Sequence, residues 1–122
     1  MIRKLLFLLP LYIFAEGDFI TDFEYGMMLY NNPRGISCAS CHGELGEGKT
    51  IVEYFDNDGK VVTIEGVDIR DKTLREISKT VARNHPIMPK YYLTQEEIKA
   101  IHYYIQRKNF PNKFLKTKPR KE

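Results

Sequence analysis

Cys38-Ala39-Ser40-Cys41-His42 is the most informative stretch of this 122-residue chain. Two thiols three positions apart lie on one helical turn, where each can form a thioether with one of the two vinyl groups of a porphyrin. The residue that follows then lies beneath the iron, which a neutral imidazole can bind. The motif therefore predicts one covalently bound haem, attached through Cys38 and Cys41, with His42 as an axial ligand.

A pair of cysteines at this spacing also occurs in redox dithiols and in zinc sites. The chain contains 2 cysteines, which excludes a zinc site with three or four thiolates from one chain. His85 and His102 lack the spacing of a zinc site with two cysteines and two histidines. A thioredoxin-like dithiol would require a βαβ pattern, which the sequence does not display. Both alternatives stay open as weaker interpretations.

The N-terminus has the pattern of a secretory signal. Arg3 and Lys4 precede an apolar run from Leu5 to Phe14, and this run is too short for a membrane-spanning helix of about 20 residues. We expect cleavage after Ala15, although an uncleaved anchor stays open. Export to the periplasm agrees with the motif, because covalent haem attachment in bacteria takes place outside the cytoplasmic membrane.

The distribution of charge along the chain supports a division into three segments. The formal net charge is +3, and removal of Arg3 and Lys4 leaves +1. We predict a signal peptide at residues 1–15, one domain at 16–112 with a net charge of −3, and a basic tail at 113–122 with +4. We expect this tail to be disordered, although it could contact anionic lipid at a membrane surface. The charge pattern does not indicate binding to nucleic acid.

Three helices are predicted, at Thr21–Tyr30, Thr73–Asn84 and Thr94–Lys108. Each begins with a threonine followed three positions later by glutamate, the pattern of a capping box. Apolar residues at helical spacing predict the buried faces: Phe23, Met27 and Tyr30; Leu74, Ile77 and Val81; and Ile98, Ile101, Tyr104 and Ile105. Gly26 costs about 1 kcal/mol relative to alanine inside a helix, so it indicates close approach by another helix. We expect His102 to lie on the surface.

A β-hairpin is predicted between the first two helices. Ile51–Phe55 and Lys60–Ile64 are rich in β-branched and aromatic residues and flank the turn sequence Asp56-Asn57-Asp58-Gly59. An isolated hairpin is only marginally stable, so we expect it to rest on the haem edge or the helical core. The letters of Gly43–Thr50 match a phosphate-binding loop, but that loop needs a strand before it and a helix after it. We therefore do not predict phosphate binding.

Pro86-Ile87-Met88-Pro89 is the second stretch with chemical meaning. Two prolines stiffen the loop and hold the thioether of Met88 in place, so Met88 is predicted as the distal ligand of the iron. Ligation by histidine and methionine stabilises ferrous iron and raises the reduction potential. His85 is the rival distal ligand, and this alternative stays open.

The order of these elements resembles that of small monohaem class I c-type cytochromes of bacteria, over roughly Phe19 to Lys108. The resemblance is carried by CASCH, by Met88-Pro89, and by Leu93-Thr94-Gln95-Glu96-Glu97-Ile98 followed by Tyr104-Ile105. It implies a mainly α, cytochrome c-like fold around one haem c, with the hairpin as a small insertion. It also implies haem binding by Cys38, Cys41, His42 and Met88, and a crossing of Gly26 and Tyr30 over Ile101 and Tyr104.

One feature of that family is missing. Its members usually have a proline whose carbonyl accepts the N–H of the proximal histidine, and no such proline follows Gly48. The acceptor for His42 is therefore unassigned.

We therefore expect an electron carrier of the periplasm rather than an enzyme. An iron with both axial positions filled by protein offers no open position to a small-molecule substrate. The expected partners are redox proteins of a respiratory chain, and the expected state is a monomer. The alternative is a haem enzyme, or a gas or redox sensor, in which the distal ligand is displaceable.

Overall fold

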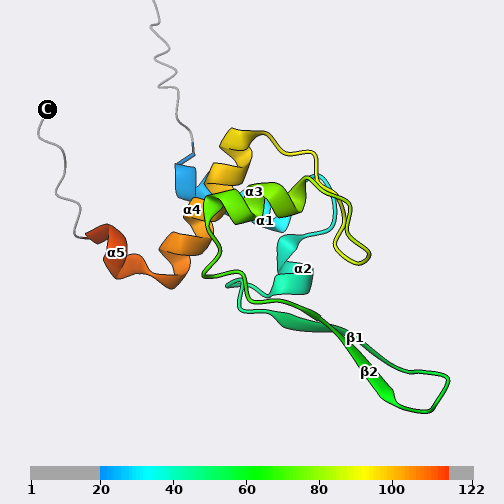
Figure 1. Cartoon of the computed structure of the whole chain (residues 1–122). Helices are drawn as coiled ribbons and strands as arrows, with labels where there is room; N and C mark the ends of the chain where they lie inside the picture. The colour runs from blue at the N-terminus through cyan, green and yellow to red at the C-terminus, as the bar shows by residue number, and fades with distance from the viewer. Residues whose placement is uncertain (1–19, 116–122) are drawn as a thin grey trace, which may run out of the picture.

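The computed structural model describes residues 20–115. Its elements are α1 (Asp22–Asn31), α2 (Cys38–His42), β1 (Lys49–Phe55), β2 (Val61–Gly66), α3 (Leu74–Val81), α4 (Gln95–Asn109) and α5 (Pro111–Leu115). The helices gather into one body, and the β1–β2 hairpin projects from it (Figure 1). The prediction of a mainly α fold with a small hairpin is confirmed. Within residues 20–115, no helix is both long and apolar enough to cross a bilayer.

The helix starts follow from their capping residues. Thr73 and Thr94 each accept from the backbone N–H of the glutamate three residues on, and each glutamate accepts from the threonine N–H, so both capping boxes are confirmed. At α1 the Thr21 hydroxyl accepts from the Glu24 N–H at 3.1 Å, which is one half of the predicted box. Capping is worth about 1 kcal/mol per helix.

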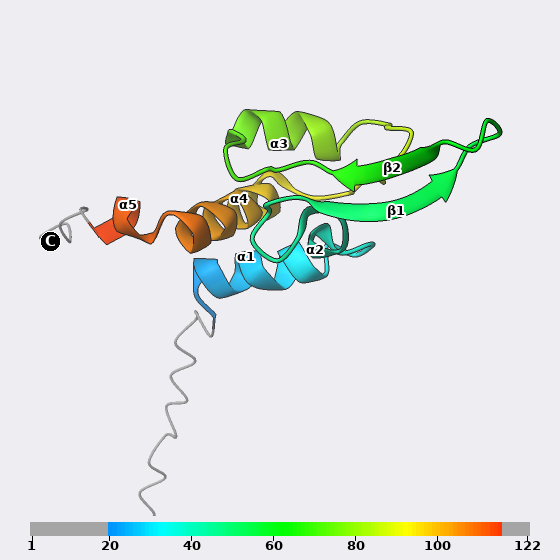
Figure 2. The same cartoon turned by 90° about the horizontal axis from the view of Figure 1, so that it is seen from below.

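The core lies where α1 crosses α4, as Figure 2 shows. A Cβ at Gly26 would overlap the Ala100 carbonyl oxygen and lie 2.8 Å from Tyr104 Cβ, so the predicted close approach at Gly26 is confirmed. The Tyr104 ring packs against Tyr30 at 5.4 Å between centroids. The buried residues around this crossing are Leu29, Tyr30, Ala100, Ile101, Tyr104 and Ile105.

Part of the prediction for the buried face of α1 is wrong. Met27 is 37% exposed, whereas Leu29 is buried. The buried face is centred on Gly26, because the backbone of α4 approaches there, and Met27 is turned about 100° away from it.

The helix α3 packs on the first half of α4 through Val81 and Ile98. It ends at Val81, three residues before the predicted end at Asn84. The chain turns back here because Pro86 disfavours helix just before it, and the Tyr91 N–H donates to the Val81 carbonyl at 2.8 Å.

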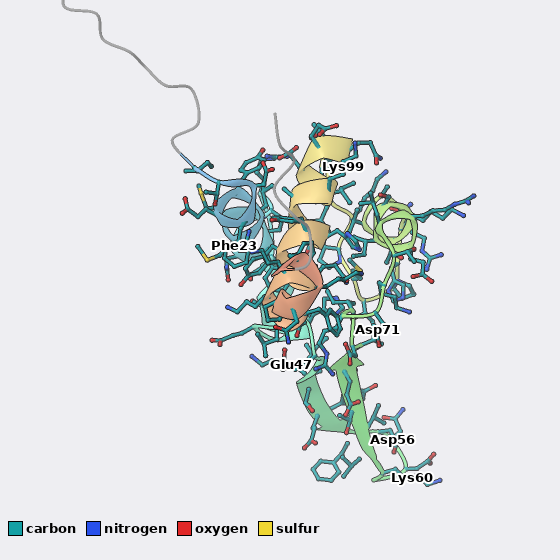
Figure 3. All side chains as sticks on the ribbon, turned by 90° about the vertical axis from the view of Figure 1, so that its left-hand side faces the viewer. Phe23, Glu47, Asp56, Lys60, Asp71 and Lys99 are labelled. Atoms are coloured by element: carbon teal, nitrogen blue, oxygen red, sulfur yellow. The ribbon has the colours of Figure 1, made fainter. Side chains whose placement is uncertain are left out.

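The hairpin has the predicted strands and turn. Its register pairs Val52 with Ile64 and Tyr54 with Val62, with an irregularity between Thr50 and Val52. All of β1 is exposed, including Phe55 at 75%, so most of the hairpin does not rest on the helical core. Of the two predicted supports, the haem edge stays open, since Ile51 lines the cavity described below. Figure 3 shows the turn at Asp56 and Lys60 at the end of the molecule remote from Lys99. Within residues 20–115, the hairpin meets the helical body at its base, through α2.

Two expectations about the C-terminal region are corrected. His102 is half-buried rather than on the surface, with Nε2 3.2 Å from the Lys72 carbonyl oxygen, and burial lowers its pKa. The first three residues of the tail predicted to be disordered belong to α5, where Phe114 packs edge-on against Tyr103 at 5.4 Å. The rest of that tail, and the predicted signal at residues 1–15, lie outside the described residues.

Arg34 links the loop before α2 to the start of α4 through hydrogen bonds. Its guanidinium donates to both carboxylate oxygens of Glu97, at 2.7 and 2.8 Å, and to the Tyr92 carbonyl oxygen at 3.0 Å. Glu97 is 6% exposed, and its hydrogen bonds to Arg34, followed by those to Thr94, lower its pKa to about 2. A buried carboxylate that loses such a partner destabilises the folded state.

Arg34→Ala is therefore expected to lower the free energy of unfolding at neutral pH, because Glu97 would lose both hydrogen bonds to the guanidinium and keep the one from the Thr94 N–H. The pKa of Glu97 is lower in the folded state, so its contribution is present above its ordinary value of 4.5 and is lost as the pH falls towards about 2. The difference between wild type and variant should therefore shrink over that interval, in denaturant unfolding measured at several pH values. Lys99→Ala removes an exposed pair with Glu96 and should change little. An Arg34 variant as stable as the Lys99 variant would contradict this assignment.

Candidate cofactor site

The CASCH motif forms the short helix α2, which is fixed at both ends. Ser37 caps its start by accepting from the Ala39 N–H at 3.1 Å. The Tyr91 hydroxyl donates to the Ile36 carbonyl at 2.7 Å, just before the helix, and the Tyr30 hydroxyl donates to the Gly43 carbonyl at 2.5 Å, just after it. Burial raises the pKa of Tyr91 to about 12, so this phenol stays protonated and able to donate. Neither tyrosine could be assigned to the site from the sequence, because both contacts are long-range.

His42 is held by the end of the hairpin. Its Nδ1 lies 2.7 Å from the Val67 carbonyl oxygen, and a carbonyl can only accept, so Nδ1 carries the proton. The lone pair of the neutral ring is then on Nε2. This contact supplies the acceptor that the sequence left unassigned, and the residue that provides it directly follows β2.

Gly66 makes the approach of Val67 possible. A Cβ at Gly66 would overlap the carbonyl oxygen of Cys41, so any larger residue would force the strand and α2 apart. A glycine at the end of a strand, away from a turn, was the one sequence signal for this contact. The hairpin thus has a structural role at its base, while most of its length is exposed.

The predicted site residues line one cavity of about 340 Å³. Cys38, Cys41 and His42 come from α2, and Met88 comes from the loop between α3 and α4. In Figure 1, α2 lies between the hairpin and this loop. Apolar side chains complete the wall, among them Ile51, Ile69, Ile77, Val81, Leu93, Ile98, Ile101 and Ile105. The structure therefore brings together predicted site residues that are up to 50 positions apart, from Cys38 to Met88.

Met88 and His85 both line this cavity, but in different environments. Met88 is half-buried and packs against the cluster of Val81, Tyr91 and Ile98. His85 is exposed, and its Nδ1 accepts from the backbone N–H groups of Ile87 and Met88, both at 3.1 Å.

The two weaker interpretations of the cysteine pair fit this environment poorly. Burial, followed by the nearby Cys41, raises the pKa of Cys38 to about 11, whereas redox dithiols depend on a lowered thiol pKa. Among residues 20–115, no three His, Cys, Asp or Glu side chains are grouped so that they could hold a metal ion. A second, more open depression of about 730 Å³ lies between the segment that leads into α3, at residues 70–74, and the second half of α4 with α5. It contains none of the predicted site residues. Gly43–Thr50 leads into strand β1 rather than a helix, which agrees with the rejection of a phosphate loop.

Comparison with known proteins decides the family. The family model described as Cytochrome c matches residues 23–108, which is more than half of the chain. The chain belongs to the cytochrome c family. The comparison matched no curated protein and no solved structure.

The cytochrome is a small class I c-type member, and its cofactor is a covalently attached haem c with iron. Proteins of this family are typically electron carriers rather than enzymes. The residues around the cavity fit such a group: two thiols on one helical turn, an imidazole with Nδ1 already bonded, a thioether sulfur, and an otherwise largely apolar wall. Gly26 and Tyr30 of the cytochrome pack against Ala100 and Tyr104, close to the crossing that the resemblance implied.

Proposed function

We propose that the protein is a periplasmic one-electron carrier whose haem c is attached through Cys38 and Cys41 and ligated by His42 and Met88. The bound haem supplies an iron that alternates between the ferric and ferrous states. Cys38 and Cys41 would hold this group covalently, His42 and Met88 would bind its iron, and the apolar wall would exclude water. The observation that carries the proposal is that all four side chains line the same cavity.

Attachment through Cys38 and Cys41 is supported by the composition of the chain. These are its 2 cysteines, so both thioethers of a haem c have to come from them. They lie one turn apart in α2, and the capping by Ser37 and the tyrosine contacts fix the ends of that helix.

Ligation by His42 is supported by its tautomer. The proton on Nδ1 is engaged by Val67, which leaves the lone pair of Nε2 available to iron. The same hydrogen bond fixes the orientation of the ring and increases its basicity.

Ligation by Met88 is supported by its position in the cavity wall and by the rigid loop that carries it. A thioether favours ferrous iron and raises the reduction potential, which suits a carrier that accepts electrons from a reduced donor. If His42 and Met88 both bound the iron, no position on it would be open to a substrate. The expected partners are redox proteins of a respiratory chain.

The periplasmic location is supported by the signal pattern of residues 1–15 and by the chemistry of covalent attachment. The N-terminal sequence of the purified protein tests it. A mature N-terminus near residue 16 in a periplasmic fraction is expected, and a cytoplasmic haem protein that retains residues 1–15 would contradict it.

Met88→Ala tests the ligation. The oxidised variant should lose the far-red sulfur-to-iron charge-transfer band, its reduction potential should fall, and its ferrous form should bind carbon monoxide. Met28→Ala is the matched control, because Met28 is 56% exposed in α1, outside the cavity. An unaltered band in the Met88 variant would overturn ligation by this residue, and ready binding of carbon monoxide by the wild type would favour a sensor or enzyme.

A further inference from the structure

The loop between Val81 and Tyr91 carries Met88 in the stretch Pro86–Pro89, where backbone donors are few. Pro86 and Pro89 have no N–H, so the N–H groups available from position 86 to 89 are those of Ile87 and Met88. Both donate to Nδ1 of His85, each at 3.1 Å. One imidazole nitrogen therefore satisfies both of the amide groups that the Pro-Ile-Met-Pro stretch offers.

This contact fixes the tautomer of His85. Because Nδ1 accepts, the proton of the neutral ring lies on Nε2, and the ring has no lone pair left for a metal. Binding iron through Nε2 would place the proton on Nδ1, which could then no longer accept from Ile87 and Met88. In the neutral ring, capping the loop and ligating iron are therefore mutually exclusive roles for His85.

We propose that His85 is a positioning residue that holds the main chain of Met88 so that its thioether stays directed at the haem site. This inference rests on the proposed His42/Met88 ligation. The loop is closed at its base by the bond from Tyr91 N–H to the Val81 carbonyl, at 2.8 Å. The hydrogen bonds to His85 fix the loop at a second point, at Met88, the residue that carries the sulfur.

The physical effect is on the entropy of the loop. A free loop would have to be ordered before its sulfur could bind iron, and each residue so fixed loses conformational entropy. With Ile87 and Met88 already held by His85, that ordering is complete before the bond forms. Losing the cap should leave methionine ligation possible but easier to displace.

The test compares wild type with His85→Asn, His85→Ala and Met88→Ala, each as the full chain with haem attached. An asparagine oxygen can accept from the backbone N–H two residues on, so His85→Asn should retain the cap, whereas alanine cannot. The measurement is the affinity of the ferric protein for added imidazole, with the far-red band recorded in parallel. His85→Ala should bind imidazole about tenfold more tightly than wild type, as expected for two lost hydrogen bonds. His85→Asn should stay close to wild type.

The outcomes separate this inference from the proposed ligation. If His85→Ala binds imidazole like wild type while Met88→Ala opens the iron, the positioning role is overturned and the ligation stands. If both His85 variants open the iron and Met88→Ala does not, His85 is the ligand and both proposals fail.

Hydrogen exchange in the wild-type protein gives a second measurement that does not depend on any variant folding. The Ile87 and Met88 amides should exchange at least about fivefold more slowly than in an unstructured peptide. Exchange at the unstructured rate would overturn the positioning role of His85.

Discussion

Cys41→Ala is expected to remove most of the covalently bound haem from the purified protein. With 2 cysteines in the chain, the variant can form at most one thioether, and no other thiol can replace the missing one. The effect on folding should be large as well, because haem would fill the cavity that α2, α3 and α4 enclose. The measurement is haem retained per polypeptide after extraction with acidified organic solvent.

Ser40→Ala is the matched control for this experiment. Ser40 lies in the same helix turn, between the two cysteines, and is exposed. Its replacement should leave the yield of haem protein unchanged. Wild-type haem content in the Cys41 variant would contradict attachment at this position, and equal loss in both variants would indicate a general defect of α2.

Much of the fold could be predicted because its signals are local. A threonine and a glutamate three residues apart specify the starts of α3 and α4, and both capping boxes are present in the structure. The turn at Asp56–Gly59 is equally local, since the Asp56 side chain accepts from the Asp58 and Lys60 N–H groups at 2.9 Å. Gly26 indicated a helix crossing, because a helix interior tolerates glycine at a cost that only close packing offsets.

The parts that could not be predicted depend on residues far apart in sequence. The buried face of α1 is set by where α4 crosses it, which helical periodicity alone does not specify, and so Met27 was assigned to the wrong side. The ordered start of the tail depends on Phe114 packing against Tyr103, one helix away. The exposure of the hairpin depends on where β1 and β2 leave the helical body.

The candidate site likewise has parts that local sequence signals specify and parts that depend on long-range contacts. The motif at residues 38–42 and the methionine between prolines were identifiable from residue type and spacing. The residues that hold the motif in place could not be identified from the sequence, since Val67, Tyr30 and Tyr91 reach α2 only in the folded chain. For His85 the sequence left the choice of role open, and its hydrogen bonds to Ile87 and Met88 favour the capping role.

Gly66→Ala is the second variant expected to have a large effect, because it acts on His42 without altering any predicted ligand. The added methyl group would overlap the Cys41 carbonyl oxygen and lie 2.5 Å from its carbonyl carbon. Both are backbone atoms, so neither can move aside as a flexible side chain would. Relief requires the end of β2 to separate from α2, which breaks the bond between His42 Nδ1 and the Val67 carbonyl.

Two measurements should respond to Gly66→Ala. The free energy of unfolding should fall by about 1–3 kcal/mol, the usual cost of forcing extra volume into packed structure. The reduction potential should rise, because an imidazole that no longer donates from Nδ1 is less basic and stabilises ferric iron less. Gly59→Ala is the control within the same hairpin: Gly59 has a φ of 75°, so alanine is strained there, but a Cβ would meet nothing within 4 Å. It should lower stability without moving the potential. A Gly66 variant with an unchanged potential would mean that the hairpin does not govern His42, and that its place beside the motif has no bearing on the iron.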